Sequence, residues 1–185
     1  MKILVATQNE HKVRELAGFL GHCLWRKVGP SWSVEETEAT LIGNALIKAR
    51  AAKAVAAADE IVIAEDTGLF VEALGGAPGV YSARYAGDGC SFEDNIQKLL
   101  SEMAHVAPGK RQACFVTVLA SIFPDGSILV SCGRLNGMIT QERRGTQGFG
   151  YDPVFLVAEK AKTLAEISLG EKNLFVICGN LHASK

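Results

Sequence analysis

Two acidic residues and a hydroxyl follow an apolar run in the first half of the chain. Glu65, Asp66 and Thr67 come directly after the sequence EIVIA, residues 60–64. A carboxylate at the C-terminal end of a buried strand lies where open α/β sheets bind their ligands. Asp66 is therefore a candidate ligand for a hard divalent cation such as Mg²⁺. The alternative is that Asp66 caps a short helix formed by LFVEAL, residues 69–74.

Mg²⁺ is commonly held by one or two protein carboxylates, while phosphate oxygens and waters fill its other positions. The acidic segment SVEETEAT, residues 33–40, offers Glu35 and Glu36 as candidates for a second carboxylate. The other interpretation is that both glutamates are solvated surface charges. Spacing alone leaves both interpretations open.

A polar segment, ATQNEHK, joins a predicted strand to a predicted helix. It places Thr7, Asn9 and Lys12 beside the free backbone N–H groups of a helix start, a position that suits phosphate. The segment lacks the glycines of known phosphate-binding loops. A plain polar loop with a solvated Lys12 is the alternative.

The segment GTQGFGYDPVF, residues 145–155, places three glycines, a pair of aromatic residues and an aspartate before a proline and an apolar strand. Phe149 or Tyr151 could stack on a purine, with Gly150 giving flexible backbone between them. Asp152 could accept a hydrogen bond from a ring N–H or an amine. The alternative is a turn that carries a core aromatic residue.

Composition limits the class of protein. The 185 residues are 48% hydrophobic, which suits a single domain over residues 1–185. The net charge is −1 with dispersed Lys and Arg, so we expect no binding of polymeric nucleic acid. Five cysteines without a C-x-x-C pair indicate a reducing cytoplasm. No apolar run reaches the roughly 18 residues of a membrane span.

Short β-branched runs and residues with helical spacing alternate along the chain. The expected strands are 2–6, 60–64, 112–123 and 127–140, and the expected helices are 10–21, 41–58 and 92–106. Thr40 and Ser91 are the expected caps of the second and third helices. The last two strands flank PDG, a turn sequence, and should form an antiparallel hairpin. This order predicts a mixed α/β sheet.

Taken together, these segments resemble the inosine triphosphate pyrophosphatase family, which hydrolyses noncanonical purine nucleoside triphosphates such as ITP, dITP and XTP. The resemblance covers nearly the whole chain. It rests on five ordered motifs: T-x-N-x-x-K (7–12), NALIKA (44–49), EDTGL…ALGGAPGVYSARYAG (65–87), GTQGFGYDPVF (145–155) and AEISLGEKN (165–173).

The resemblance implies a long twisted mixed β-sheet flanked by helices, with two lobes around a central cleft, usually in a homodimer. It also implies Mg²⁺-dependent attack of water on the triphosphate, which releases a nucleoside monophosphate and pyrophosphate. Asp66 then matches the proton acceptor and metal-site carboxylate. Glu36 is the best match to the second metal-site acid, and Glu35 is its close rival. Thr67 matches a residue that contacts substrate.

The remaining matches concern the two ends of the nucleotide. Lys12, Lys48 and Lys172 correspond to basic residues that meet phosphate oxygens, where they offset charge that would repel the attacking hydroxide. Phe149 and Asp152 correspond to the loop that binds the base.

The sequence departs from the family near its C-terminal end. Val176, Ile177 and Cys178 occupy the places of a Ser-His-Arg sequence whose His and Arg contact the base. The alternative function is therefore a nucleotide-binding module with impaired turnover or selectivity. Another alternative is a related pyrophosphatase of the septum-inhibitor type, which acts on pyrimidine or modified nucleotides. That family lacks the paired motifs GGAPGVYSARYAG and FGYDP, which this chain contains, so the resemblance to it is weaker. A smaller departure is Gly43, which replaces a frequent Glu and should weaken the helix start by roughly 1 kcal/mol.

Overall fold

The computed structural model describes residues 1–173, which divide into two compact units. Unit 1 contains residues 1–66 and 117–133, and unit 2 contains residues 67–116 and the described residues from Arg134 on. Three long strands contribute residues to both units: β3 (Glu60–Val71), β5 (Gln112–Ile122) and β6 (Ile128–Ile139). The single domain and the two-lobed cleft stay predictions.

The strands form one eight-stranded sheet in the order β2-β1-β3-β5-β6-β7-β8, with β4 paired to β3. The short strands are β1 (Lys2–Val5), β2 (Leu24–Lys27), β4 (Pro78–Gly79), β7 (Phe155–Val157) and β8 (Lys162–Thr163). Strand β1 is parallel to β2 and β3, whereas β4, β7 and β8 pair antiparallel with their neighbours. The predicted mixed sheet is confirmed.

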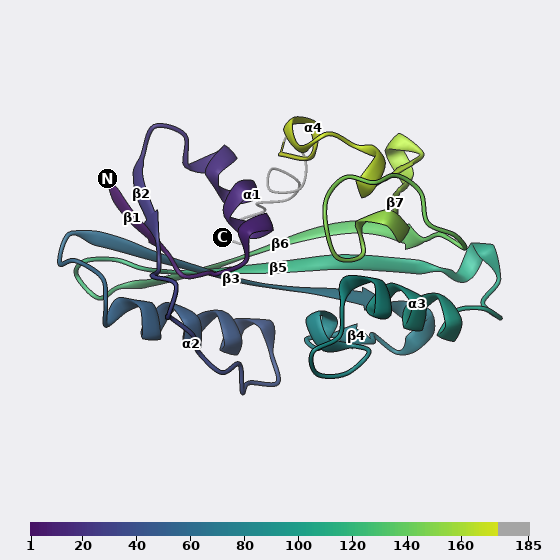
Figure 1. Ribbon diagram of the computed structural model, residues 1–185, viewed down its shortest axis with the longest axis horizontal. Coiled ribbons are helices and arrows are strands. Elements are labelled where there is room, and N and C mark those ends of the chain that lie inside the picture. The colour runs from purple at the N-terminus through teal and green to yellow at the C-terminus, as the bar shows by residue number, and fades with distance from the viewer. Residues whose placement is uncertain (174–185) are drawn as a thin grey trace, which may run out of the picture. The chain divides into compact units, whose positions relative to one another are not determined.

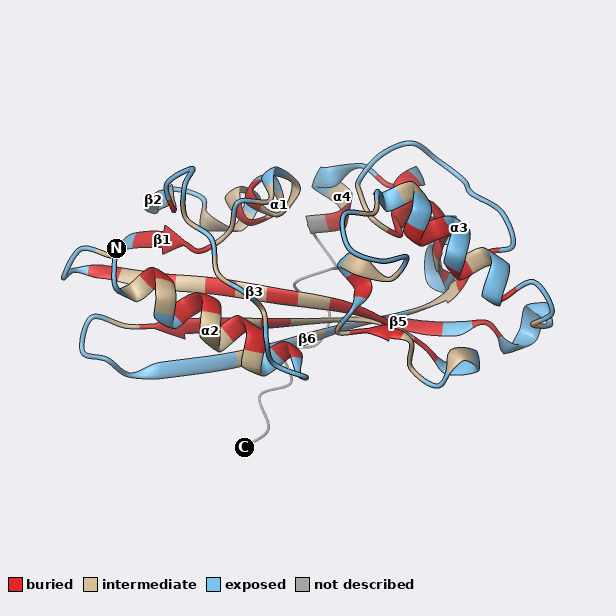
Figure 2. Cartoon of the chain, turned by 60° about the horizontal axis from the view of Figure 1, so that its bottom comes forward, coloured by how far each residue is buried: buried red, intermediate tan, exposed pale blue. Residues whose placement is uncertain are grey.

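In unit 1, helices α1 (Glu10–Leu20) and α2 (Leu41–Lys53) lie on opposite sides of β3 (Figure 1). Ile63 packs with Ile3, Val5 and Leu16, which places the odd-numbered residues of β3 on the α1 side. The even-numbered residues face the other way, and Asp66 among them contacts α2 through Lys48. Helix α2 buries one face, which is visible along its length in Figure 2.

Both helices of unit 1 begin at side-chain caps. The side chain of Asn9 accepts hydrogen bonds from two N–H groups of α1, and Thr40 accepts one from Gly43. Helix α2 ends at Lys53, five residues before the predicted end. The alanine-rich continuation turns back because the Glu60 carboxylate accepts the Ala57 N–H at 2.7 Å. A tertiary contact thus overrides helix propensity.

Strand β3 is longer than predicted. It continues through Asp66 to Val71, so Asp66 lies within the strand and not at its end. The alternative in which Asp66 caps a helix at 69–74 is wrong, because only a 3-10 turn over Glu72–Leu74 forms there. Instead, Leu69 pairs with Gly79 of β4 and donates its N–H to Ser82 Oγ at 2.8 Å. These partners satisfy the backbone in an extended conformation.

Unit 2 contains α3 (Phe92–Glu102) and the short α4 (Leu169–Asn173). Ser91 caps α3 in a reciprocal capping box with Asp94, as predicted. Helix α3 ends four residues earlier than expected, where the buried Arg111 guanidinium donates to the carbonyls of Met103 and Val106. The apolar core gathers side chains from α3, β3, β5, β6, β7 and the turns beside them: Leu69, Val71, Ile96, Leu99, Met103, Ala113, Ile139, Val154, Phe155 and Val157, among others.

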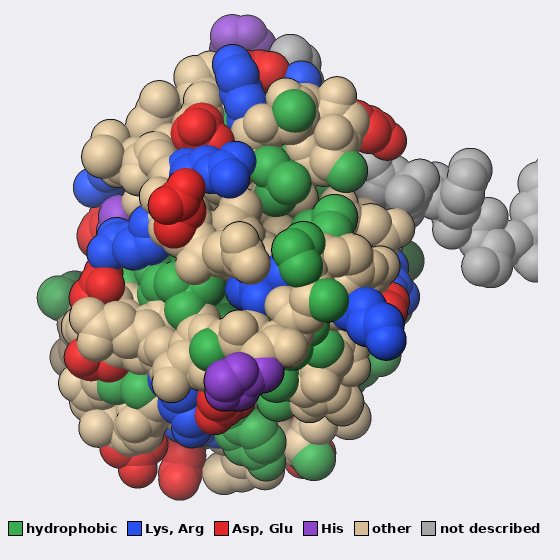
Figure 3. All heavy atoms as spheres, turned by 90° about the vertical axis from the view of Figure 1, so that its right-hand side faces the viewer, with side chains coloured by type: hydrophobic (Ala, Val, Ile, Leu, Met, Phe, Trp, Pro, Cys, Tyr) green, Lys and Arg blue, Asp and Glu red, His purple; other side chains and the backbone are tan. Residues whose placement is uncertain are grey.

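The predicted hairpin of β5 and β6 is confirmed. The Phe123 N–H donates to the Ser127 carbonyl at the turn, and the Ile139 N–H donates to Arg111 at the open end. Charges are mixed on the face drawn in Figure 3, where Lys and Arg side chains alternate with Asp and Glu. Within residues 1–173, no helix is long and apolar enough to cross a membrane.

Candidate active site

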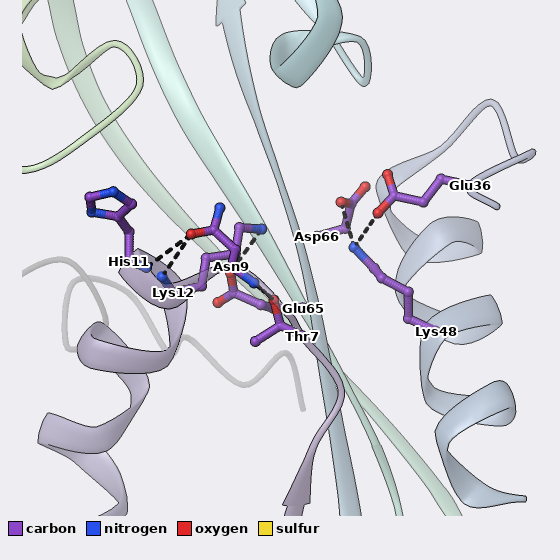
Figure 4. Close-up of polar contacts among 8 residues, drawn as sticks. All are labelled: Thr7, Asn9, His11, Lys12, Glu36, Lys48, Glu65 and Asp66. Carbon is purple, nitrogen blue, oxygen red and sulfur yellow. Dashed lines mark hydrogen bonds and ion pairs between the residues drawn. The ribbon is translucent and has the colours of Figure 1, made fainter. Parts of the chain in front are cut away.

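Two carboxylates of unit 1 share one buried lysine. Lys48 Nζ lies 2.8 Å from Glu36 Oε1 and 2.9 Å from Asp66 Oδ1, as Figure 4 shows. Lys48 comes from α2, Asp66 from β3, and Glu36 from the acidic loop that precedes α2. Lys48 and Asp66 are only 8% and 6% exposed. The formal charge of the trio is −1, so a cation would still be attracted here.

The second oxygen of Asp66 has an unusual environment. Asp66 Oδ2 is buried and has no hydrogen-bond partner among the described residues. Burial raises the pKa of the Asp66 carboxyl, and Glu36 raises it further, while Lys48 and Lys12 oppose the shift. A buried carboxylate oxygen without a donor is costly unless a ligand or water completes it.

The chemistry of Asp66 and Glu36 fits a hard divalent cation. Asp66 offers a buried oxygen without a described partner, and Glu36 contacts the same lysine from the loop before α2. Proteins commonly bind Mg²⁺ through one or two carboxylates, and Asp66 and Glu36 supply two. In the described part of the chain, no group of three or more His, Cys, Asp or Glu side chains could hold a metal alone. Phosphate and water would have to supply the rest.

A second ion pair lies on the other side of β3. Lys12 Nζ is 2.9 Å from Glu65 Oε1, and both side chains are less than one-fifth exposed. Because Glu65 and Asp66 are consecutive in a strand, their side chains point to opposite faces. Burial lowers the pKa of Lys12, but Glu65, Asp66 and Glu36 outweigh it, so the pKa is raised. Lys12 therefore stays charged near neutral pH.

The loop before α1 is ordered by its own side chains. Asn9 Oδ1 accepts the N–H groups of His11 and Lys12, and Thr7 Oγ1 accepts the Asn9 N–H at 3.1 Å. Figure 4 shows these residues grouped beside Glu65. The structure thus brings together Thr7, Asn9 and Lys12, the three residues that the sequence selected for phosphate.

In unit 2, the glycine-rich loop is held by Asp152. Asp152 Oδ2 accepts the Phe149 N–H at 3.0 Å and is 2.8 Å from Lys172 Nζ. A Cβ atom on Gly148 would lie 1.9 Å from the same oxygen, and Gly148 has a φ of +77°. Only glycine fits there, because both space and backbone conformation exclude a side chain. Lys172 Nζ also lies 6.0 Å from the centre of the Phe149 ring.

Tyr151 is an anchor of this loop. Its ring is buried in the core, and its hydroxyl donates to the Ser82 carbonyl at 2.9 Å. Burial raises the pKa of the Tyr151 phenol, with smaller contributions from Tyr85 and Cys90. Of the two candidate stacking residues, Tyr151 thus matches the alternative of a core aromatic. Phe149 is half-buried and stays the candidate for stacking.

The whole chain can be compared with known proteins. The model of the Ham1 family matches residues 3–177, nearly its full length. The chain belongs to the Ham1 family. A dITP/XTP pyrophosphatase of Thermoanaerobacter sp. (strain X514) is 47% identical, covering 94% of this chain and 88% of the relative. One from Escherichia coli (strain K12) is 46% identical, with 93% and 89% covered. The resemblance found in the sequence is confirmed.

Solved structures agree with this assignment. The Ham1 protein of Staphylococcus aureus matches with a TM-score of 0.78 at 39% identity, over 93% of this chain and 89% of that chain. A nucleoside-triphosphatase / dITP/XTP pyrophosphatase of Mycobacterium abscessus matches with a TM-score of 0.73 at 36% identity, over 94% and 93%. The mixed sheet of this Ham1-family chain is therefore shared with experimental structures.

Several predicted site residues acquire definite surroundings in this Ham1-family chain. Glu36 is half-buried against Lys48, whereas Glu35 is exposed, which favours Glu36 as the second carboxylate. Lys172 was expected at phosphate, yet the partners shown for it are Asp152 and the Phe149 ring. Thr67 follows Asp66 in β3 and is half-buried. Its contact with substrate stays a prediction.

Sequence reasoning left two residues of this Ham1 protein without a role. Glu65 was noticed beside Asp66, and only the long strand shows that it faces Lys12. Phe92 belongs to the predicted helix 92–106, and the centre of its ring lies 5.9 Å from that of Phe149. The signal available in the sequence was a phenylalanine directly after the Ser91 cap, and the structure shows that its side chain is 43% exposed. Val176, Ile177 and Cys178 lie outside the described residues.

Proposed function

We propose that this protein hydrolyses deaminated, noncanonical purine nucleoside triphosphates (ITP, dITP and XTP) to the monophosphate and pyrophosphate, with Mg²⁺. The names of relatives at 46–47% identity support this activity. The observation that carries it is the buried Asp66 carboxylate, with one oxygen on Lys48 and the other without a described partner. Such a group can accept a proton from water and bind a cation.

The residues of unit 1 serve the triphosphate. Asp66 accepts the proton of the attacking water, because its buried carboxylate keeps one oxygen without a described partner. Lys48 and Lys12 offset the charge of the phosphate oxygens. Thr7 and Asn9 hold the loop that carries Lys12. Mg²⁺, when held by Glu36 and Asp66, would neutralise charge on the phosphates.

The residues of unit 2 serve the base. Phe149 offers a half-buried ring, and the hydrogen bond from its N–H to Asp152 fixes the loop that presents it. The proximity of Lys172 to that ring supports a role in holding this loop. Gly150 has open space beside its Cα, so its backbone is approachable. The homodimer and the cytoplasmic location are predictions from the sequence and its resemblance.

One assay tests this function and its alternatives. Pyrophosphate release is measured from ITP, XTP, dTTP and ATP at saturating Mg²⁺ and again with a chelator. Preferred release from ITP and XTP, lost with the chelator, is the expected result. Preference for dTTP would favour the septum-inhibitor type. Tight binding of ITP without release would favour the binding module suggested by Val176, Ile177 and Cys178.

A further inference from the structure

The first turn of α2 holds the acidic loop, residues 33–40, by a hydrogen bond. Asn44 is completely buried, and its Oδ1 accepts the backbone N–H of Glu38 at 3.0 Å. Asn44 lies four residues before Lys48, so the two side chains share one face of the helix. The residue that binds the loop therefore stands one turn from the residue that binds Glu36.

Gly43 makes room for the same loop. A Cβ atom at Gly43 would lie 2.6 Å from Glu38 Cβ and 2.7 Å from Glu38 Cγ. The backbone of Gly43 is that of an ordinary helix, so close packing and not conformation requires glycine. The glycine that was predicted only to weaken the helix start thus allows Glu38 to pack on α2.

We propose that Asn44 is a positioning residue for the metal-site carboxylate Glu36, and that Gly43 leaves the space in which the loop packs on α2. This inference rests on the proposed function. Two residues span at most about 7 Å, so fixing the Glu38 amide restricts where the Glu36 backbone can go. Glu36 is thereby kept within reach of Lys48 and of the Asp66 side of β3.

Two buried atoms without described hydrogen-bond partners belong to the same region. Among the described residues, the buried side-chain atoms without a hydrogen-bond partner are Asn44 Nδ2 and Asp66 Oδ2. Both residues lie on the α2 side of β3. An unpaired buried polar atom is costly unless water or a ligand completes it, so both atoms mark this side of β3 as a place where a polar group binds. Asn44 keeps that donor unpaired beside the loop that carries Glu36.

The test uses the full chain and two readouts. Binding of Mn²⁺ is titrated by electron paramagnetic resonance with pyrophosphate present, and the Mg²⁺ midpoint of ITP hydrolysis is measured beside it. We expect Asn44→Ala to raise the Mn²⁺ dissociation constant about tenfold or more, as for other residues that orient a metal ligand. Ile42→Ala, on the exposed side of the same turn, is the matched control and should change neither value.

A double-mutant cycle separates positioning from general stability. In the background Glu36→Gln, Asn44→Ala should have no further effect on Mn²⁺ binding, because its target is already gone. An equal loss in both backgrounds, an unchanged dissociation constant, or a parent that binds no Mn²⁺ would overturn the inference. Gly43→Ala, which displaces the loop without deleting a polar group, replaces Asn44→Ala if that variant does not fold. A parent that binds Mn²⁺ but hydrolyses no nucleotide would refute the proposed function alone.

Discussion

Glu65 and Asp66 are consecutive residues of β3, yet each pairs with a lysine from a different helix. Lys12 of α1 lies 2.9 Å from Glu65, and Lys48 of α2 lies 2.9 Å from Asp66. Alternation along the strand explains this division, because neighbouring side chains point to opposite faces. Lys12 of α1 and Lys48 of α2 thus approach the consecutive carboxylates Glu65 and Asp66 from opposite faces of the sheet.

Removing the Lys12 charge should weaken triphosphate binding. We expect Lys12→Ala to raise the KM for ITP about tenfold, the equivalent of roughly 1.4 kcal/mol, because a charge-assisted phosphate contact is lost. Inhibition by inosine, which lacks phosphate, should be unchanged. Lys27→Ala is the control, since Lys27 forms an exposed pair with Glu10 at the start of the same helix. Equal losses for inosine and ITP would mean that Lys12 acts on folding.

The ring of Phe149 should contribute to base binding alone. Loss of stacking on one base costs about 1–3 kcal/mol, so Phe149→Ala should raise the KM for ITP by five-fold or more. Inorganic tripolyphosphate has no base, and its hydrolysis or competitive inhibition should be unaffected. Phe92→Ala should shift ITP in the same direction by less, because Phe92 contacts Phe149 from α3. An equal effect on tripolyphosphate would contradict a base-specific role.

The ion pair between Arg26 and Glu60 should make stability depend on pH. Hydrogen bonds from Arg26 and from the Ala57 N–H lower the pKa of Glu60, against the effect of burial. Because the pKa of Glu60 is lower in the folded than in the unfolded state, its ionised carboxylate stabilises the fold above the unfolded-state pKa. This stabilisation is lost as the pH falls through the folded-state pKa. The free-energy advantage of the parent over Glu60→Gln should therefore shrink between about pH 5 and pH 3. The free energy of unfolding of both proteins is measured in urea at each pH. If the difference between the parent and Glu60→Gln does not change with pH, the ionised Glu60 does not stabilise the fold through Arg26.

The C-terminal departure leads to a test of selectivity. Restoring Ser-His-Arg with Val176→Ser, Ile177→His and Cys178→Arg together should raise the ITP-to-ATP ratio of kcat/KM at least about tenfold. The reason is that donors suited to a 6-oxo purine are left unpaired against the 6-amino group of adenine, at about 1–3 kcal/mol each. An unchanged ratio would assign selectivity to the Phe149–Asp152 loop.

The sequence predicted the caps, the hairpin and the mixed sheet because these depend on local patterns. Asn9 was placed beside the helix start, and Thr40 and Ser91 were expected as caps, as observed. It missed β2, whose residues Leu24–Lys27 follow α1 without a clear apolar pattern. It also ended β3 too early, since the pairing of Leu69 with Gly79 is a non-local contact.

The sequence predicted which residues belong to the candidate site but not how they are arranged. Asp66, Lys48 and Glu36 were selected from separate segments, and the structure joins them in one cluster. The opposite orientation of Glu65 depends on β3 continuing past Asp66, which the apolar run alone did not indicate. The space at Gly43 could not be seen, because it depends on where Glu38 packs.

The most direct test of the account is hydrolysis of ITP by the parent and by Asp66→Asn, with Mg²⁺ present and pyrophosphate as the measured product. The amide cannot accept the proton, so kcat should fall by at least about a hundredfold. The thermal unfolding of the variant should stay close to that of the parent, because Lys48 keeps Glu36 as its partner. Unchanged kcat in a folded Asp66→Asn variant would contradict the assignment of Asp66, and a parent that releases no pyrophosphate from ITP or XTP would contradict the proposed function.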